Sequence, residues 1–172
     1  MGMSMMAVAH SRLGLRPFLP DDTPLLREIF RDSIEALTEE DYTAAQQDAW
    51  ASMADDTIAF GKKLAGELTL VATMEGSPVG FTSLEGKDKI DMLYVHPAAA
   101  GQGVGAMLID ALEKLAGARG APKLFVDASD NARGFFEKRG YVAQQRNTVS
   151  IGDEWLANTT LHKQLAAKRE AS

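Results

Sequence analysis

The 172-residue chain contains no cysteine. This absence excludes disulfide bonds, thiolate metal sites and a cysteine nucleophile. Histidine is also scarce: His10, His96 and His162 stand far apart and lack the spacing of metal ligands. We therefore expect no bound metal, and we expect any chemistry to fall to carboxylates, hydroxyls and backbone groups.

The chain also lacks an excess of positive charge and a long apolar run. Its 24 acidic and 18 basic residues give a formal net charge of -6. This balance argues against nonspecific binding to nucleic acid or to a membrane surface. No run approaches the roughly 20 apolar residues of a membrane-spanning helix, and the apolar start has no basic segment of a signal peptide. We expect a cytoplasmic protein with neither nucleic acid nor membrane as a partner.

No repeat, low-complexity tract or linker rich in proline and serine divides the chain. At this length one domain can bury a sizeable core, whereas two domains are not expected. We expect residues 1–10 to be disordered or an addition from cloning, and residues 11–172 to form a single domain.

The apolar pattern predicts alternating helices and strands. Strands are expected at the start of "LGLRPFLPDD" and in "ELTLVATM", "SPVGFTSLEG", "DKIDMLYV", "KLFVDAS", "YVAQQRNTVSI" and "EWLANTTLHKQL". Helices are expected from Pro24 onward, in "YTAAQQDAWASM", in "GAMLIDALEKLAGARG" and in "DNARGFFEKRG". This order, βααβββαβαββ, predicts an α/β (α+β) fold whose sheet is mixed and mostly antiparallel, with one parallel crossover.

Three glycines at alternate positions, Gly101, Gly103 and Gly105, join a predicted strand to a predicted helix. The unpaired N–H groups and the dipole of a helix N-terminus attract phosphate, and glycine removes the Cβ atoms that would hold it away. The alternative is a flexible turn that needs positive φ angles. A P-loop is not expected, because Ala106 and Met107 stand where that motif has lysine followed by serine or threonine.

Two blocks of sequence resemble one known family. "IDMLYVHPAAAGQGVGAMLIDAL" and "NARGFFEKRGYV" have the order and separation found in the GCN5-related N-acetyltransferases (GNATs). In that family an L-x-V strand segment leads into an (Arg/Gln)-x-x-Gly-x-(Gly/Ala) loop, which corresponds here to residues 100–105, with Ala100 at the Arg/Gln position. The resemblance runs from about Leu13 to Leu165. It implies the GNAT fold, a seven-stranded sheet with splayed central strands and about four helices.

The resemblance also implies acetyl-CoA as the cosubstrate, with no metal. The main chain of Leu93, Tyr94 and Val95 would pair with the pantetheine arm. The pyrophosphate would be held by Gly101, Gln102, Gly103, Val104, Gly105 and Ala106. Asn131, Phe135 and Lys138 lie where family members contact the far end of the cofactor.

Asp91 is the preferred general base, because an amine must lose a proton before it attacks a thioester. Strand alternation predicts that Asp91 shares a face with Leu93 and Val95. The alternatives for Asp91 are an anchor for a substrate cation or a salt bridge with Lys89 or Lys123.

The general acid is less clearly marked. Many family members have a tyrosine where this chain has Phe136, and a phenyl ring donates no proton. Tyr94, Tyr141 and Ser129 are the candidate substitutes, with solvent as the alternative, and Tyr94 is also expected to pack under a helix.

The acceptor pocket is expected between the first helices and the last hairpin. Tyr42 and Trp50 fit a Y-x-x-x-Q-x-x-A-W pattern that resembles a subgroup of YafP-like proteins. The predicted substrate-binding residues are Tyr42, Trp50, Asp91, Trp155 and Asn158. The resemblance implies acetyl transfer to a primary amine of a small molecule or peptide by direct attack, and a homodimer as in many members. The alternative is a noncatalytic acyl-CoA-binding sensor.

Overall fold

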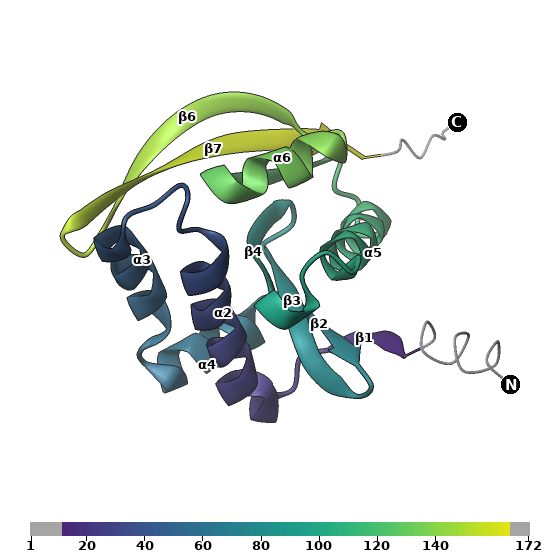
Figure 1. Ribbon diagram of the computed structural model, residues 1–172. Coiled ribbons are helices and arrows are strands. Elements are labelled where there is room, and N and C mark those ends of the chain that lie inside the picture. Colours follow the sequence, from purple (N-terminus) through teal and green to yellow (C-terminus); the bar gives the residue numbers. More distant parts are fainter. Residues whose placement is uncertain (1–11, 166–172) are drawn as a thin grey trace, which may run out of the picture.

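The computed structural model describes residues 12–165 (Figure 1). The strands are β1 (Leu13–Pro17), β2 (Leu68–Met74), β3 (Ser77–Glu85), β4 (Lys89–Val95), β5 (Lys123–Ser129), β6 (Val142–Ile151) and β7 (Glu154–Gln164). The α-helices are α2 (Thr23–Leu37), α3 (Ala44–Ala51), α4 (Thr57–Gly66), α5 (Val104–Ala118) and α6 (Asp130–Lys138). Residues 1–10, for which disorder was predicted, lie outside the described range.

The strands form one seven-stranded sheet in the order β1-β2-β3-β4-β5-β7-β6. Every neighbouring pair is antiparallel except β4 and β5, which are parallel and are joined through α5. All seven predicted strands and the single crossover are therefore confirmed. No helix in residues 12–165 has the length and apolar character needed to cross a bilayer.

The helices differ from the prediction in one respect. Two helices were expected before β2, whereas the structure has three, and the described residues contain five α-helices instead of about four. The additional helix is α4, which begins where the Asp56 side chain accepts a hydrogen bond of 3.0 Å from the Ala59 backbone. Its interior Gly61 weakens the helical pattern, but a Cβ there would approach Thr23 Oγ1 to 3.0 Å. Glycine at position 61 therefore allows α4 to pack closely on α2.

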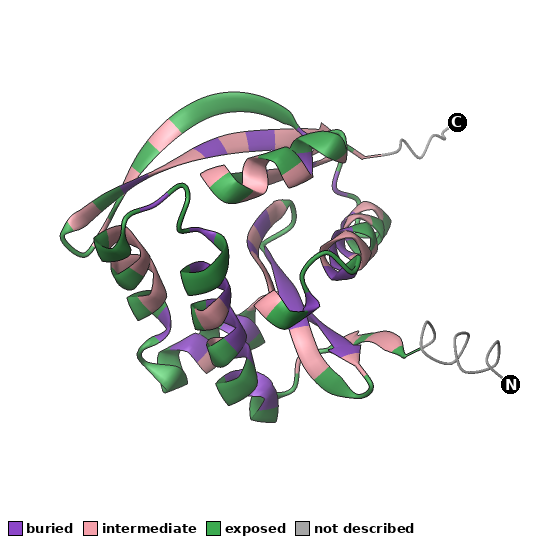
Figure 2. Cartoon of the chain, viewed as in Figure 1, coloured by how far each residue is buried: buried purple, intermediate pink, exposed green. Residues whose placement is uncertain are grey.

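Two apolar clusters cover the two faces of the sheet. One gathers α5, α6 and residues of the sheet such as Leu84, Ile90 and Leu124. The other gathers α2, α4 and residues such as Phe81 and Met92. Figure 2 shows the burial concentrated in the central strands and the inner faces of the helices, while β6 at the edge is largely exposed. Burial of these apolar side chains provides the main driving force for this layered arrangement.

The central strands β4 and β5 separate soon after they meet. Their ladder consists of only two pairs, Lys89 with Phe125 and Ile90 with Val126. From Asp91 onward β4 is paired with β3 alone, and its other edge faces the gap between the two strands. The predicted splayed pair is confirmed, and the gap is where the candidate site lies.

Candidate active site

A cavity of about 220 Å³ lies at the gap between β4 and β5. Five parts of the chain form its walls: residues 90–94 of β4, residues 126–129 of β5, helix α6, the β6–β7 hairpin, and the first helices with their connection. Figure 1 shows these elements, with β6 and β7 arching over α6 and the open end of β4. Polar side chains at this cavity include Ser33, Tyr42, Asp91, Tyr94 and Asn158.

A β-bulge sets the direction of Asp91. Ser83 of β3 pairs with Met92, and the next residue, Leu84, pairs with Ile90, so Asp91 has no partner of its own. The extra residue changes the alternation of the strand: Leu93 and Val95 pack in the cluster on the α5 side, whereas Asp91 forms an ion pair with Lys63 of α4. The prediction that Asp91 shares a face with Leu93 and Val95 is therefore wrong, because strict alternation does not survive a bulge.

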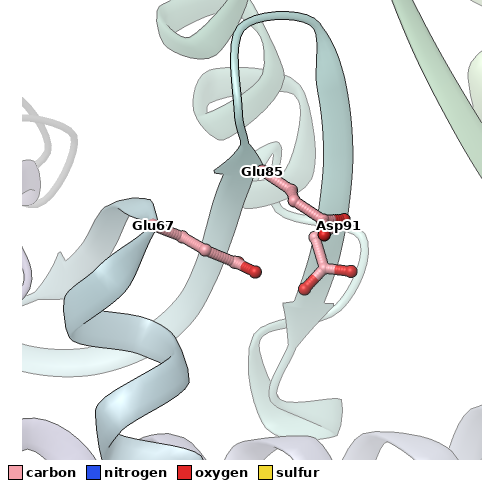
Figure 3. Close-up of side chains that lie close together, drawn as sticks. All are labelled: Glu67, Glu85 and Asp91. Atoms are coloured by element: carbon pink, nitrogen blue, oxygen red, sulfur yellow. The ribbon is translucent and has the colours of Figure 1, made fainter.

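Asp91 belongs to a group of three carboxylates that we call the acidic cluster: Glu67, Glu85 and Asp91. Carboxylate oxygens of the three residues all lie within 4.8 Å of one another. Figure 3 shows them converging from the segment after α4, the end of β3 and the bulge of β4. Lys63 Nζ lies 3.1 Å from Asp91 Oδ2 and 3.3 Å from Glu67 Oε2. The predicted salt-bridge partners of Asp91 are thus replaced by Lys63, since Lys89 pairs instead with Asp127.

The charges in the acidic cluster influence one another. Burial, and after it the nearby charge of Asp91, raises the pKa of the Glu67 carboxyl above its ordinary value, although the neighbouring Ser83 hydroxyl acts to lower it. For Lys63, burial alone would lower the pKa, but Asp91 and Glu67 outweigh burial and the net pKa is raised. The acidic cluster therefore favours a bound ammonium group.

Tyr94 lies beside this group on β4 and contacts the cavity. It packs against Phe30 of α2 with ring centroids 4.7 Å apart, as expected for a residue under a helix. Trp50 Nε1 donates a hydrogen bond of 3.2 Å to the Tyr94 hydroxyl. Burial raises the pKa of Tyr94 far above its ordinary value. The phenol therefore stays protonated near neutral pH and keeps a proton that it can donate.

Tyr42 connects the first helices to the far side of the cavity. Its hydroxyl donates to the Ala157 carbonyl at 2.7 Å and accepts from the Asp130 backbone N–H at 2.9 Å. One buried side chain thereby ties the α2–α3 connection to β7 and to the start of α6. Tyr42 and Trp50, both predicted from the sequence, line the cavity, as does Asn158, which accepts a hydrogen bond from Asn147.

Trp155 is not brought to the cavity. It lies near the tip of the β6–β7 hairpin with 63% of its surface exposed, and it does not line the pocket. The next residues of β7, Leu156, Ala157 and Asn158, line the cavity instead. Trp155 contributes its backbone, because its carbonyl accepts a hydrogen bond from Gln46 Nε2 at 2.8 Å.

The glycine loop has the geometry that its sequence predicted. Gly101 and Gly103 have φ angles of 78° and 85°, and Gly103 is the N-cap of α5. No atom lies within 4 Å of where a Cβ would stand on either residue, so the loop surface is open. The N–H groups of the first helical turn have no partner within the helix. The loop can therefore present several backbone donors and the positive end of the α5 dipole to an anion.

Gly105 has a different reason to be glycine. A Cβ there would touch the Phe135 ring at 3.4 Å, so α5 and α6 approach closely at this point. Asn131 lies at the start of α6 and lines the cavity, and Lys138 is exposed near the end of the same helix. The structure thus gathers Phe135, Asn131 and Gly105 on the same side of the open strand edge, while Lys138 lies further along α6.

The candidate proton donors, which would replace the tyrosine that many family members have at position 136, differ in their position and in their hydrogen bonds. Phe136 is buried and lines the cavity. Tyr141 donates its hydroxyl proton to Glu113 at 2.9 Å and does not line the cavity, which removes it from consideration. Ser129 lines the cavity, but its hydroxyl donates to Asn131 Oδ1 at 2.7 Å. Of the three candidates, Tyr94 is the one that lines the cavity and donates its proton to no described residue.

Sequence reasoning missed two members of this site. Lys63 and Glu67 lie in and after α4, the helix that was not predicted, and nothing in their local pattern distinguishes them from solvated charges. Glu85 stands beside the turn residues "GKDK", where a solvated carboxylate is the ordinary expectation. Only the bulge at Asp91, which depends on strand pairing, turns the third carboxylate toward them.

The chain is similar to known proteins over most of its length. A sequence profile described as "Acetyltransferase (GNAT) domain" matches residues 38–157, a range that includes the bulge, the glycine loop and most of the cavity walls. The N-acetyltransferase YafP of Escherichia coli (strain K12) is 31% identical over 148 residues, which are 86% of this chain and 93% of YafP.

Two solved structures share the fold. The crystal structure of a GCN5-related N-acetyltransferase from Rhodopseudomonas palustris has a TM-score of 0.88 and 64% identity, and the match covers 88% of this chain and 95% of that one. PaiA N-acetyltransferase from Thermoplasma acidophilum, solved in complex with coenzyme A, has a TM-score of 0.73 and 17% identity, covering 88% and 98% of the two chains. At 17% identity the likeness concerns the fold alone.

Proposed function

Since the chain belongs to the GNAT family of acetyltransferases, we propose that it transfers the acetyl group of acetyl-CoA to a primary amine of a small molecule or peptide by direct attack. The observation that carries this proposal is the cavity at the splayed strands. It brings a carboxylate, Asp91, and a protonated phenol, Tyr94, to the same open edge of β4.

The acetyl-CoA would lie along that edge and over the glycine loop. The backbone at the open edge of β4, from Leu93 through Tyr94 to Val95, is suited to pair with the amides of the pantetheine arm as an added strand would. The N–H groups from Gly101 to Ala106 suit the pyrophosphate, and the open space at Gly101 and Gly103 supports this fit. PaiA, which has the same fold, binds coenzyme A.

Asp91 and Tyr94 divide the proton transfers. A primary amine is an ammonium ion at neutral pH, so it first gives a proton to Asp91, directly or through water. The amine nitrogen then attacks the thioester carbonyl, a C–N bond forms, and the C–S bond breaks. The Tyr94 hydroxyl gives its proton to the departing thiolate. The nitrogen of the new amide loses its second proton, which returns to the Tyr94 phenolate directly or through water, and Asp91 releases its proton to solvent as the amide and CoA leave.

The experiment combines cofactor binding with turnover. Calorimetry with acetyl-CoA, CoA and ATP is expected to show binding of the first two and none of ATP. Release of free thiol is then measured across a panel of primary amines, with Asp91→Asn as the variant. Absence of acetyl-CoA binding at millimolar concentration would contradict the proposal.

A second candidate function rests on Phe136. The buried phenyl ring supplies no proton at the position where many family members have a tyrosine. A noncatalytic acyl-CoA sensor would bind acetyl-CoA and release no thiol with any amine. That combination of results would favour the sensor over the enzyme.

A further inference from the structure

The acidic cluster continues the cavity away from the glycine loop. Asp91 is both a wall of the cavity and a member of the cluster, so the three carboxylates begin where the acceptor amine must stand. Glu67 and Glu85 lie behind Asp91, and Figure 3 shows the Glu67 carboxylate pointing toward the other two. An acceptor that extends past Asp91 therefore meets carboxylates.

The cluster carries more negative charge than its neighbours neutralise. Three carboxylates face one ammonium group, that of Lys63. The other lysine on this part of β4, Lys89, is paired with Asp127 at 3.3 Å. The raised pKa of Glu67 has the same physical origin, because a buried carboxylate beside another is costly to ionise. A further positive group would relieve this repulsion.

Glu67 also has an acceptor atom that no described residue uses. Its side chain is 9% exposed, and Oε1 is buried without a hydrogen-bond partner among residues 12–165. A buried polar atom that lacks a partner is costly, so such atoms usually have a ligand or another partner to complete them. The orphaned oxygen lies in the same side chain that points into the cluster.

The position of Lys63 indicates which kind of ligand the acidic cluster can bind. Its primary ammonium already lies between Asp91 and Glu67, at 3.1 Å and 3.3 Å. The Lys63 side chain is 45% exposed and hangs on a flexible four-carbon stem, so it can turn out into solvent. The position that it occupies is suited to the ammonium group of another molecule.

We propose that the acidic cluster binds the second ammonium group of a diamine acceptor, which takes the place of Lys63 while the first nitrogen reacts in the cavity. This inference rests on the proposed acetyltransferase function and narrows its acceptor to amines with two positive groups. The distal nitrogen keeps its proton and its charge, and Glu67 and Glu85 hold it. The reacting nitrogen alone is deprotonated and acetylated.

The arrangement has a consequence for the product. Acetylation converts one ammonium group into a neutral amide. If the monoacetylated diamine returned with its free amine at the thioester, its amide would face the acidic cluster and no charge would fill the subsite. The enzyme therefore acetylates a diamine once, and the monoacetylated product is a poor substrate.

The test compares amines that differ only in the second ammonium group. Putrescine is measured against butylamine, and diaminopropane against propylamine. Wild-type kcat/KM is expected to be at least about tenfold higher for each diamine, as for one charge-assisted hydrogen bond. In Glu67→Gln the putrescine value should fall about tenfold or more while butylamine changes little, and mass spectrometry should find a single acetyl group per diamine.

Matched variants separate binding from folding. Glu85→Gln changes an exposed member of the cluster and should reduce the preference for diamines without affecting stability. Glu28→Gln makes the same chemical change at an exposed position on α2 and should leave the preference intact. Lys63→Met removes the resident ammonium and should tighten putrescine binding.

A binding measurement makes the inference independent of turnover. Calorimetry should show putrescine, but not butylamine, binding to the wild type and losing affinity in Glu67→Gln, even if no amine were acetylated and the proposed function failed. If the protein acetylates diamines and monoamines with equal kcat/KM, the diamine subsite is overturned while the proposed acetyltransferase function stands. Binding of Mg²⁺ or Ca²⁺ to the cluster without binding of putrescine would overturn it as well.

Discussion

The Trp50 indole donates its N–H to the hydroxyl oxygen of Tyr94 across 3.2 Å. This bond joins α3 to the central strand β4 and occupies an acceptor site of the phenol, not its proton. Among the described residues, no acceptor takes the Tyr94 proton in a hydrogen bond. The hydroxyl is therefore oriented by Trp50 and is able to donate into the cavity.

Tyr94→Phe tests this donor. The variant keeps the ring packing but removes the proton, so kcat for acetyl transfer should fall about a hundredfold, while KM for acetyl-CoA changes little. Steady-state thiol release provides the measurement. Tyr141→Phe is the control, because its hydroxyl bonds to Glu113 away from the cavity. A Tyr94→Phe enzyme as fast as the wild type would assign protonation of the thiolate to solvent.

Asp91→Asn tests the base. At neutral pH the variant should lose about a hundredfold or more in kcat/KM for the amine, because Asp91 is the member of the acidic cluster that lines the cavity and its carboxylate is lost. The deficit should shrink as the pH rises toward the amine pKa near 10.4, where solvent supplies free amine. A pH–rate profile checks this. Asp88→Asn, in the exposed β3–β4 turn, should behave as wild type, and a deficit independent of pH would argue against proton removal by Asp91.

Gly103→Ala tests the glycine loop. The φ angle of 85° is unfavourable for alanine by about 1–2 kcal/mol, and relaxation would turn the backbone donors away from a pyrophosphate. KM for acetyl-CoA should rise about tenfold or more, with a smaller effect on kcat. Gly120→Ala is the matched control: its φ is 93°, it lies just after α5, and its surroundings are equally open. It should lose similar stability while its KM stays unchanged.

Tyr42→Phe tests the connection across the cavity. The change removes a hydrogen bond to Ala157 and one from Asp130, and it leaves both backbone groups without their partner. The free energy of unfolding should fall by about 1–3 kcal/mol, as urea denaturation can measure. Acetyl-CoA binding should weaken less, because the glycine loop does not contact Tyr42. An unchanged unfolding midpoint would mean that water replaces both bonds at no cost.

Glu67→Gln tests the electrostatic cost of the acidic cluster. The folded protein holds the Glu67 pKa above its ordinary value of 4.5. The contribution of Glu67 to the free energy of unfolding is therefore fully present below pH 4.5, and it is lost as the pH rises through the raised pKa. Glutamine does not ionise. The variant should therefore unfold at a higher temperature than the wild type at about pH 8, and the advantage should vanish at about pH 4. Thermal unfolding at the two pH values checks the sign, and a stability gain only in acid would contradict it.

Local signals in the sequence predicted most of the framework. Alternating apolar residues marked all seven strands, and a polar start with a proline marked α2. Gly101, Gly103 and Gly105 marked a loop between a strand and a helix, and the structure gives Gly101 and Gly103 the positive φ angles that the sequence analysis had attached to the alternative of a flexible turn. Helix α4 was not predicted, because Gly61 weakens its helical pattern. The same glycine allows α4 to pack closely on Thr23.

The catalytic surroundings were less predictable. Of the predicted substrate-binding residues, Tyr42, Trp50 and Asn158 line the cavity, whereas the Trp155 side chain near the hairpin tip is largely exposed and does not. Their binding of a substrate stays a prediction. The predicted face of the Asp91 side chain was wrong, because the prediction assumed regular strand alternation. A period of two holds only while the ladder is regular, and the bulge opposite Ser83 and Leu84 ends that regularity.

The sequence by itself determined the strands, the crossover, the glycine loop and the family, because each depends on residues close together in the chain. Only the tertiary structure decided what surrounds the reacting group. Lys63, Glu67, Glu85 and Asp91 come from separate elements, and their carboxylates and ammonium act as one charged group only because pairing of β3 with β4 and packing of α4 bring them together. Electrostatic interaction depends on distance in space, and separation along the chain does not reveal it.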